Sequence, residues 1–127
     1  MVYGEQRGTA VCDYDHDGRP DLVVTENSAA TRLFHNVNGK PGIRVVLSGP
    51  AGNPSGIGAQ LRLKTAAGWG PAREVHGGSG YWSQDGAVQV ISGAGKANKL
   101  QVRWPGGKES MVEVPSEAKE LRAQFEN

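Results

Sequence analysis

The sequence has a single cysteine, almost no charge imbalance and no long hydrophobic run, and each of these absences excludes a class of protein. Cys12 is alone among 127 residues, so no disulfide can form within the chain. Fourteen basic and 13 acidic side chains leave a net charge of +1, which offers no electrostatic basis for binding nucleic acid or an acidic membrane. No apolar run approaches the ~18–20 residues that cross a bilayer, so we expect no membrane span.

Glycine and proline are plentiful, with 19 and seven residues, which indicates many turns and few long helices. Between the turns lie short segments in which apolar and polar residues alternate, as in half-buried strands. After Ser116 the pattern fits a turn of helix followed by a strand that carries Leu121, Ala123 and Phe125. The chain is therefore predicted to be all-β, with strands at residues 9–12, 22–25, 31–35, 43–47, 59–64, 72–76, 87–91, 99–104 and 109–114.

Residues 13–21, DYDHDGRPD, place four aspartates around one glycine, which is the strongest chemical signal in the chain. Carboxylates this close repel one another unless a cation neutralises them. Hard oxygen donors at relative positions 1, 3, 5 and 9 suit Ca²⁺, and the residue at position 7 can add its backbone carbonyl. We therefore predict a calcium site formed by Asp13, Asp15, Asp17, the carbonyl of Arg19, and Asp21.

The segments that flank this acidic loop decide which kind of calcium site it is. A helical EF-hand needs flanking helices and a glutamate at position 12 of the loop, where this chain has Val24. The loop instead joins two predicted strands, so we expect a strand-to-strand clasp in which the metal is structural. Tyr14 and His16 alternate with the ligands and are expected to point away from the ion. Cys12, beside the first ligand, is interpreted as a buried and inert thiol.

A second cluster, at residues 77–84, has two interpretations. The residue types of a hydrolase triad are present in and around it, although without the Gly-Xaa-Ser-Xaa-Gly spacing: His76, Ser79 or Ser83, and Asp85. The favoured interpretation is a glycine turn that brings Tyr81 and Trp82 against the sheet. A sugar-like ligand that stacks on these two rings is an intermediate hypothesis.

Two known families share these patterns. Residues 8–25, GTAVCDYDHDGRPDLVVT, resemble an FG-GAP/VCBS repeat. That resemblance implies a propeller-blade-like hairpin whose Asp-rich loop holds Ca²⁺ through the residues named above. The remainder is similar to the ASPIC/UnbV domain in three motifs, at residues 56–61, 77–84 and 102–107. Where that family usually reads Phe-Gly-Leu-Gly, this chain has ISGAG at residues 91–95.

The resemblances imply two units, residues 1–38 as the FG-GAP/VCBS-like repeat and residues 42–127 as the ASPIC/UnbV-like β domain. The fold is then a calcium-loop β-hairpin joined to a small β-sandwich or barrel-like domain. One blade cannot close a propeller, because each blade buries its faces against its neighbours. The chain is therefore expected to be the C-terminal part of a longer protein, or to pack its repeat on the second unit or on a partner copy. Both families imply an extracytoplasmic or secreted protein without enzymatic activity.

The predicted function is a non-catalytic, Ca²⁺-stabilised, β-rich binding or adhesion module with a protein or carbohydrate ligand. Two alternatives stay open. The first is a hydrolase or carbohydrate-processing enzyme that uses His76, Ser79 and Asp85. The second is a structural oligomerisation domain that forms a homo-oligomer through exposed β edges.

Overall fold

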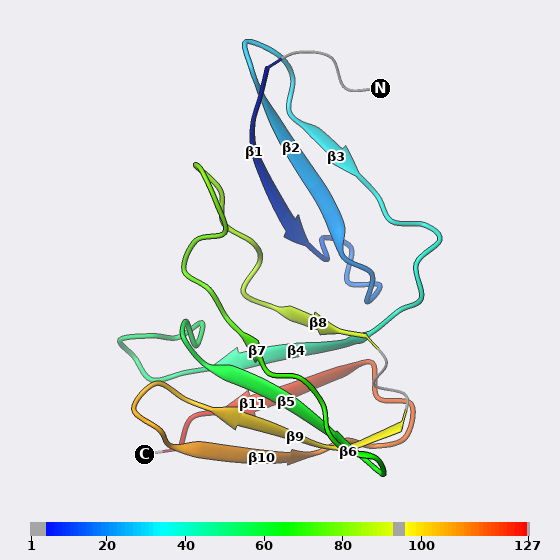
Figure 1. Ribbon diagram of the computed structural model, residues 1–127, viewed down its shortest axis with the longest axis vertical. Helices are drawn as coiled ribbons and strands as arrows, with labels where there is room; N and C mark the ends of the chain where they lie inside the picture. The colour runs from blue at the N-terminus through cyan, green and yellow to red at the C-terminus, as the bar shows by residue number, and fades with distance from the viewer. Residues whose placement is uncertain (1–4, 93–95, 127) are drawn as a thin grey trace.

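The computed structural model describes residues 5–92 and 96–126 (Figure 1). In this part of the chain there are three sheets and no α-helix, which confirms the all-β prediction. None of the described residues belongs to a helix with the length and hydropathy needed to cross a bilayer. Part of the ISGAG segment, residues 93–95, lies outside the described residues. The strands are β1 (Glu5–Cys12), β2 (Asp21–Asn27), β3 (Arg32–Phe34), β4 (Ile43–Ser48), β5 (Gln60–Thr65), β6 (Gly68–Trp69), β7 (Arg73–Glu74), β8 (Gln89–Ile91), β9 (Ala97–Arg103), β10 (Glu109–Glu113) and β11 (Glu120–Gln124).

The first three strands form an antiparallel sheet of their own, in the order β1-β2-β3. Cys12 pairs with Asp21, so the acidic loop is closed at its base by the last pair of the β1–β2 ladder. Leu22 lies opposite both Val11 and Phe34, which places a row of three apolar side chains across the sheet. The predicted hairpin is therefore present, and β3 extends it to three strands.

The second unit is a sandwich of two sheets. One sheet has the order β10-β9-β5-β6, with β7 also paired to β5, and the other has the order β11-β4-β8. Alternate residues of the facing strands point into a shared core, which explains the period-two pattern of the sequence. Among the described strands neither sheet closes into a barrel, so the sandwich is the form observed. The core includes Ile43, Val45, Leu47, Leu121 and Ala123 from one sheet and Leu61, Leu63, Leu100 and Val102 from the other.

Trp104 fills the end of this core, directly after β9. Its side chain is almost fully buried, with 2% of its surface exposed. The indole Nε1 donates a 2.8 Å hydrogen bond to Ser110 Oγ, and the ring of Phe125 meets the indole edge-on at 5.6 Å. The indole thus buries its apolar surface while its single donor keeps a partner, which is the usual requirement for a buried tryptophan.

The C-terminal segment corrects one expectation. Ser116 does not begin a turn of helix, because residues 116–117 form a reverse turn in which Glu117 has a φ of 65°. The chain then enters β11, which pairs in parallel with β4 and places Leu121 opposite Val45. Leu121 and Ala123 are both buried, so a period of two, and not of 3.6, satisfies this segment. The predicted strand is confirmed and the predicted helical turn is wrong.

The three-stranded sheet stands at one end of the sandwich, with its acidic loop next to the region where β4 and β8 lie (Figure 1). Backbone hydrogen bonds join the two units at this junction. Gly42 N–H donates to Gly18 O over 2.8 Å, and Gly86 N–H donates to Val11 O over 2.9 Å. Asp85 strengthens the second contact, because its Oδ1 accepts from Val11 N–H at 2.7 Å. The acidic loop is therefore part of the surface that joins the units.

Replacing a leucine by alanine should destabilise the protein far more in the core of the sandwich than on the surface of the three-stranded sheet. We expect Leu61→Ala to lower the free energy of unfolding by about 2–5 kcal/mol, because the fully buried side chain leaves a cavity. The matched control is Leu33→Ala, which removes the same atoms from a side chain that is 48% exposed and should cost about 0.5 kcal/mol or less. Urea unfolding measures both values. Equal losses in the two variants would contradict the assigned core.

Candidate metal site at the junction of the two units

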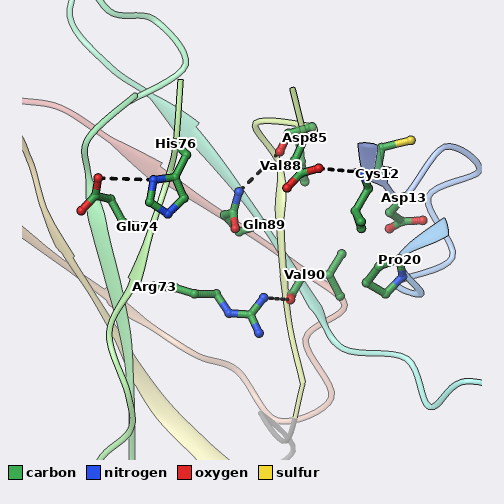
Figure 2. Close-up of a pocket in the computed structure, with 12 residues that line it drawn as sticks. Cys12, Asp13, Pro20, Arg73, Glu74, His76, Asp85, Val88, Gln89 and Val90 are labelled. Atoms are coloured by element: carbon green, nitrogen blue, oxygen red, sulfur yellow. Dashed lines mark hydrogen bonds and ion pairs between the residues drawn. The ribbon is translucent and has the colours of Figure 1, made fainter. Parts of the chain in front are cut away.

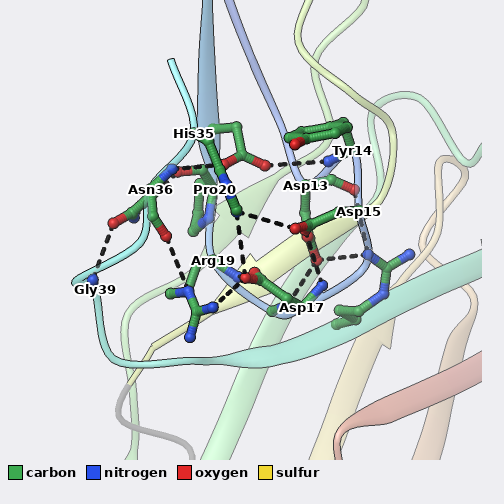
Figure 3. Close-up of polar contacts among 12 residues, drawn as sticks. Asp13, Tyr14, Asp15, Asp17, Arg19, Pro20, His35, Asn36 and Gly39 are labelled. Carbon is green, nitrogen blue, oxygen red and sulfur yellow. Dashed lines mark hydrogen bonds and ion pairs between the residues drawn. The ribbon is translucent and has the colours of Figure 1, made fainter. Parts of the chain in front are cut away.

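Hydrogen bonds from backbone amides to aspartate carboxylates stabilise the turn of the acidic loop (Figure 3). Asp13 Oδ2 accepts from Gly18 N–H at 3.0 Å, and Asp17 Oδ1 accepts from Arg19 N–H at 2.8 Å. Gly18 has a φ of +80°, a conformation that favours glycine, and this allows the chain to reverse between Asp17 and Arg19. The aspartates therefore shape the turn as well as crowding it with charge.

The four predicted aspartates fall into two overlapping groups of possible ligands. Ligand atoms of Asp13, Asp15 and Asp21 lie within 4.8 Å of one another, and so do those of Asp15, Asp17 and His35. Asp15 belongs to both groups and lies at the centre of the arrangement. His16, with a φ of 65°, is exposed and belongs to neither group, in keeping with its expected outward direction.

The guanidinium of Arg19 contacts the acidic loop and the segment after β3. Its Nη2 forms an ion pair with Asp17 Oδ2, and its Nε donates to Asn36 O at 2.9 Å. Burial opposes ionisation of Asp17, but the amide and guanidinium of Arg19 hold the pKa of this carboxyl below its usual range. The carbonyl of Arg19 as a metal ligand stays a prediction.

His35 is the member of the site that sequence reasoning missed. Its Nε2 lies 3.0 Å from Asp15 Oδ2 and 3.7 Å from Asp17 Oδ2, and its ring meets Tyr14 edge-on at 5.5 Å. Local spacing gives no signal for this residue, because its place depends on how β3 pairs with β2. Leu22 pairs with Phe34, so His35, which follows β3, arrives beside the Asp21 end of the loop.

Asp13 is buried, with 1% of its side chain exposed. Its Oδ2 is 2.5 Å from Arg44 Nη1 of β4, in addition to the bond from Gly18. Its Oδ1 is also buried and has no hydrogen-bond partner. A buried carboxylate oxygen without a partner is costly, and a bound cation would satisfy it. The donor set, rich in carboxylate oxygen, therefore fits a hard cation such as Ca²⁺.

A cavity of about 220 Å³ lies beside the loop and is lined by both units (Figure 2). Cys12, Asp13 and Asp85 lie together on one side, and Glu74 and His76 line the other. Cys12 is half-buried, and burial together with the charges of Asp21, Asp13 and Asp85 raises the pKa of its thiol. This environment disfavours the thiolate, which supports the interpretation of an inert thiol.

The hydrolase alternative needs Ser79, His76 and Asp85 to form one connected group. His76 instead pairs with Glu74, with Nδ1 and Oε1 3.6 Å apart, and Asp85 accepts from a backbone amide. Ser79 lines a different hollow, next to Tyr81. In the described part of the chain the three predicted residues therefore do not assemble into a triad.

The loop at residues 77–84 also differs from its favoured interpretation. Its backbone packs on β1, where a side chain at Gly8 would come within 3.2 Å of the carbonyl oxygens of Tyr81 and Trp82. The two rings do not lie against the sheet. They stack on each other at 5.5 Å with an interplanar angle of 15°, and they are 63% and 86% exposed. The glycine of β1 thus lets the loop backbone approach, while the aromatic rings face solvent.

Glu120 of β11 makes the stability of the protein fall as the pH falls. Burial opposes its ionisation, but hydrogen bonds from Arg44 and Arg122 lower its pKa below the ordinary value of 4.5. Its stabilising contribution is then complete above pH 4.5 and is lost as the pH falls through the lowered pKa. We expect the urea midpoint of the wild-type chain to fall more between pH 6 and pH 3 than that of Glu120→Gln. The control is Glu113→Gln, which removes an exposed carboxylate paired with Lys99 and should follow the wild-type profile.

Comparison with known proteins identifies the sandwich. The family model for ASPIC and UnbV matches residues 49–124, and it begins after the acidic loop. Cartilage acidic protein 1 of Xenopus tropicalis is 30% identical over 110 residues, which cover 83% of this chain and 17% of that protein. The Mus musculus protein of the same name is 30% identical over 120 residues, which cover 90% of this chain and 18% of that protein. This chain therefore spans less than a fifth of the length of these relatives. The predicted ASPIC/UnbV resemblance is confirmed, and the chain belongs to the ASPIC and UnbV family.

Proposed function

We propose that this chain is a non-catalytic binding module stabilised by Ca²⁺ at the acidic loop. The observation that carries the proposal is Asp13 Oδ1, a buried carboxylate oxygen without a hydrogen-bond partner, next to the carboxylates of Asp15 and Asp21. Four aspartates within nine residues supply the charge that a hard divalent cation needs. The ligands would be the side chains of Asp13, Asp15, Asp17 and Asp21, with the carbonyl of Arg19.

A bound Ca²⁺ would supply positive charge and a crosslink, and no reaction step. The chain itself provides the rest of the site. Backbone amides of Gly18 and Arg19 already orient two of the carboxylates, so the loop is shaped before a metal arrives. Asp21, in β2, and Asp13, after β1, lie on opposite sides of the hairpin, so an ion between them would tie its two strands together.

The module is proposed to be the C-terminal part of a longer extracytoplasmic or secreted protein. Residues 1–38 would be a single FG-GAP/VCBS-like repeat and residues 42–127 the ASPIC/UnbV domain. The much greater length of the matched relatives supports a longer parent protein. Their name, which refers to cartilage, supports a place outside the cell. Ser79, His76 and Asp85 do not contact one another as a catalytic triad, and this favours a binding function over a catalytic one.

Calcium should stabilise the wild-type chain. At about one hundred times its Kd, Ca²⁺ should add about 2.7 kcal/mol to the free energy of unfolding, or a rise of roughly ten degrees in Tm. Asp15→Ala should abolish this response, because Asp15 belongs to both groups of ligand atoms. His16→Ala, at the exposed neighbouring position, should retain it. The measurement is the Tm in EDTA and in millimolar Ca²⁺. An identical Tm of the wild type in both buffers would refute the calcium site.

The exposed Tyr81–Trp82 pair favours a carbohydrate as one ligand of the module, since aromatic faces stack on sugar rings. We expect the wild type to be retained by a panel of immobilised neutral oligosaccharides and Trp82→Ala to lose at least tenfold in affinity, or about 1.4 kcal/mol. The control is Trp69→Ala, because the Trp69 ring is already covered by Arg62 and Lys64. Retention of both variants at wild-type strength would assign the ligand to another surface.

A further inference from the structure

Arg44 connects the acidic loop to the sandwich. In β4, Ile43, Val45 and Leu47 belong to the sandwich core, so Arg44 and Val46 point to the opposite face of the sheet. Arg44 is nevertheless buried, with 7% of its side chain exposed. A charged side chain in this position needs partners, and it has two. Its Nη1 lies 2.5 Å from Asp13 Oδ2, and its Nε donates to Glu120 Oε2 at 3.3 Å.

The two oxygens of Asp13 have different environments. Arg44 and the amide of Gly18 both bind Oδ2, whereas the buried Oδ1 has no hydrogen-bond partner. A single carboxylate can therefore face an ion with one oxygen and Arg44 with the other. The guanidinium holds Asp13 in place without occupying the oxygen that the ion would use.

A backbone contact runs beside this pair. Gly18 O accepts from Gly42 N–H, two residues before Arg44, so the loop meets the start of β4 through both main chain and side chain. The approach is close, because a Cβ at Gly18 would lie 2.8 Å from Gly42 O. From Arg44 the contacts continue to Glu120, its in-register neighbour on β11, and then to Arg122, whose Nη2 is 2.8 Å from Glu120 Oε1.

We infer that Arg44 is a positioning residue of the metal site, through which Ca²⁺ binding in the loop restrains β4 and β11 of the sandwich. The inference rests on the proposed calcium site. An ion bound to Asp13 Oδ1 would hold the carboxylate in one orientation. The carboxylate would then hold the guanidinium of Arg44, which also donates to Glu120. Binding of the metal in the loop then restrains the sandwich strands through Arg44, and the placement of the three-stranded sheet on the sandwich depends on whether the metal is bound.

Hydrogen exchange of the complete chain, followed by mass spectrometry with Ca²⁺ or EDTA, tests the inference. In the wild type, Ca²⁺ at about ten times its Kd should slow exchange by about tenfold in peptides of the loop and also in those of β4 and β11. Arg44→Met is measured at about ten times its own Kd for Ca²⁺, because the loss of the Asp13 contact should weaken binding. At that occupancy the loop should still respond to Ca²⁺, while β4 and β11 should lose their response. The control is Arg62→Met, in β5, where the side chain bonds Gly70 O and the wild-type pattern should persist.

Two further variants keep the test decisive if Arg44→Met does not fold. Arg44→Lys supplies a point charge that pairs with Asp13 and lacks the fork that reaches Glu120, so β11 should lose its response while the loop keeps it. Glu120→Gln keeps the Asp13–Arg44 pair and should weaken the response of β11 alone. If the wild-type loop itself does not respond to Ca²⁺, the proposed metal site is wrong. If the loop responds and β4 and β11 do not, or if Arg44→Lys transmits the response fully, the inference is wrong and the metal site stands.

Discussion

The concentration of negative charge in the acidic loop is the constraint on which the junction depends. Four aspartates lie within nine residues, and the chain meets their repulsion in three ways. Backbone amides bind the carboxylates of Asp13 and Asp17, Arg19 pairs with Asp17, and Arg44 reaches in from the sandwich to pair with Asp13. One buried oxygen of Asp13 is left without a partner. The compensation is therefore incomplete in a way that a single hard cation would complete.

This electrostatic arrangement also explains how a small three-stranded sheet is held on a separate sandwich. The sandwich has its own core, in which β4 and β11 face β5 and β9. The three-stranded sheet joins it through Gly18 and Gly42, through Val11 with Asp85 and Gly86, and through the Asp13–Arg44 pair. The loop backbone at Tyr81 and Trp82 also approaches Gly8 of β1. The Asp13–Arg44 ion pair is therefore one of several polar and backbone contacts that join the sheet to the sandwich.

The surfaces left open by the fold are consistent with a module that binds. The Tyr81–Trp82 pair lies on a loop whose backbone approaches Gly8 closely, and both aromatic side chains are exposed. The cavity beside the loop brings together charged groups from both units, but His76 and Asp85 have separate partners there. The chain belongs to the ASPIC and UnbV family and spans less than a fifth of the length of the relatives it matches.

The sequence by itself determined the features that depend on neighbouring residues. The alternation of apolar residues predicted the strands. The spacing of Asp13, Asp15, Asp17 and Asp21 predicted that these carboxylates lie near one another, because they belong to one loop of nine residues. The tertiary structure decided what depends on distant segments. Arg44 is 31 positions from Asp13, and Glu120 is 76 positions from Arg44, so no local pattern could pair them. The parallel pairing of β11 with β4, the arrival of His35 and the failure of Ser79 to join His76 follow from the same physical reason: each is set by the packing of whole strands and loops, which local spacing does not record.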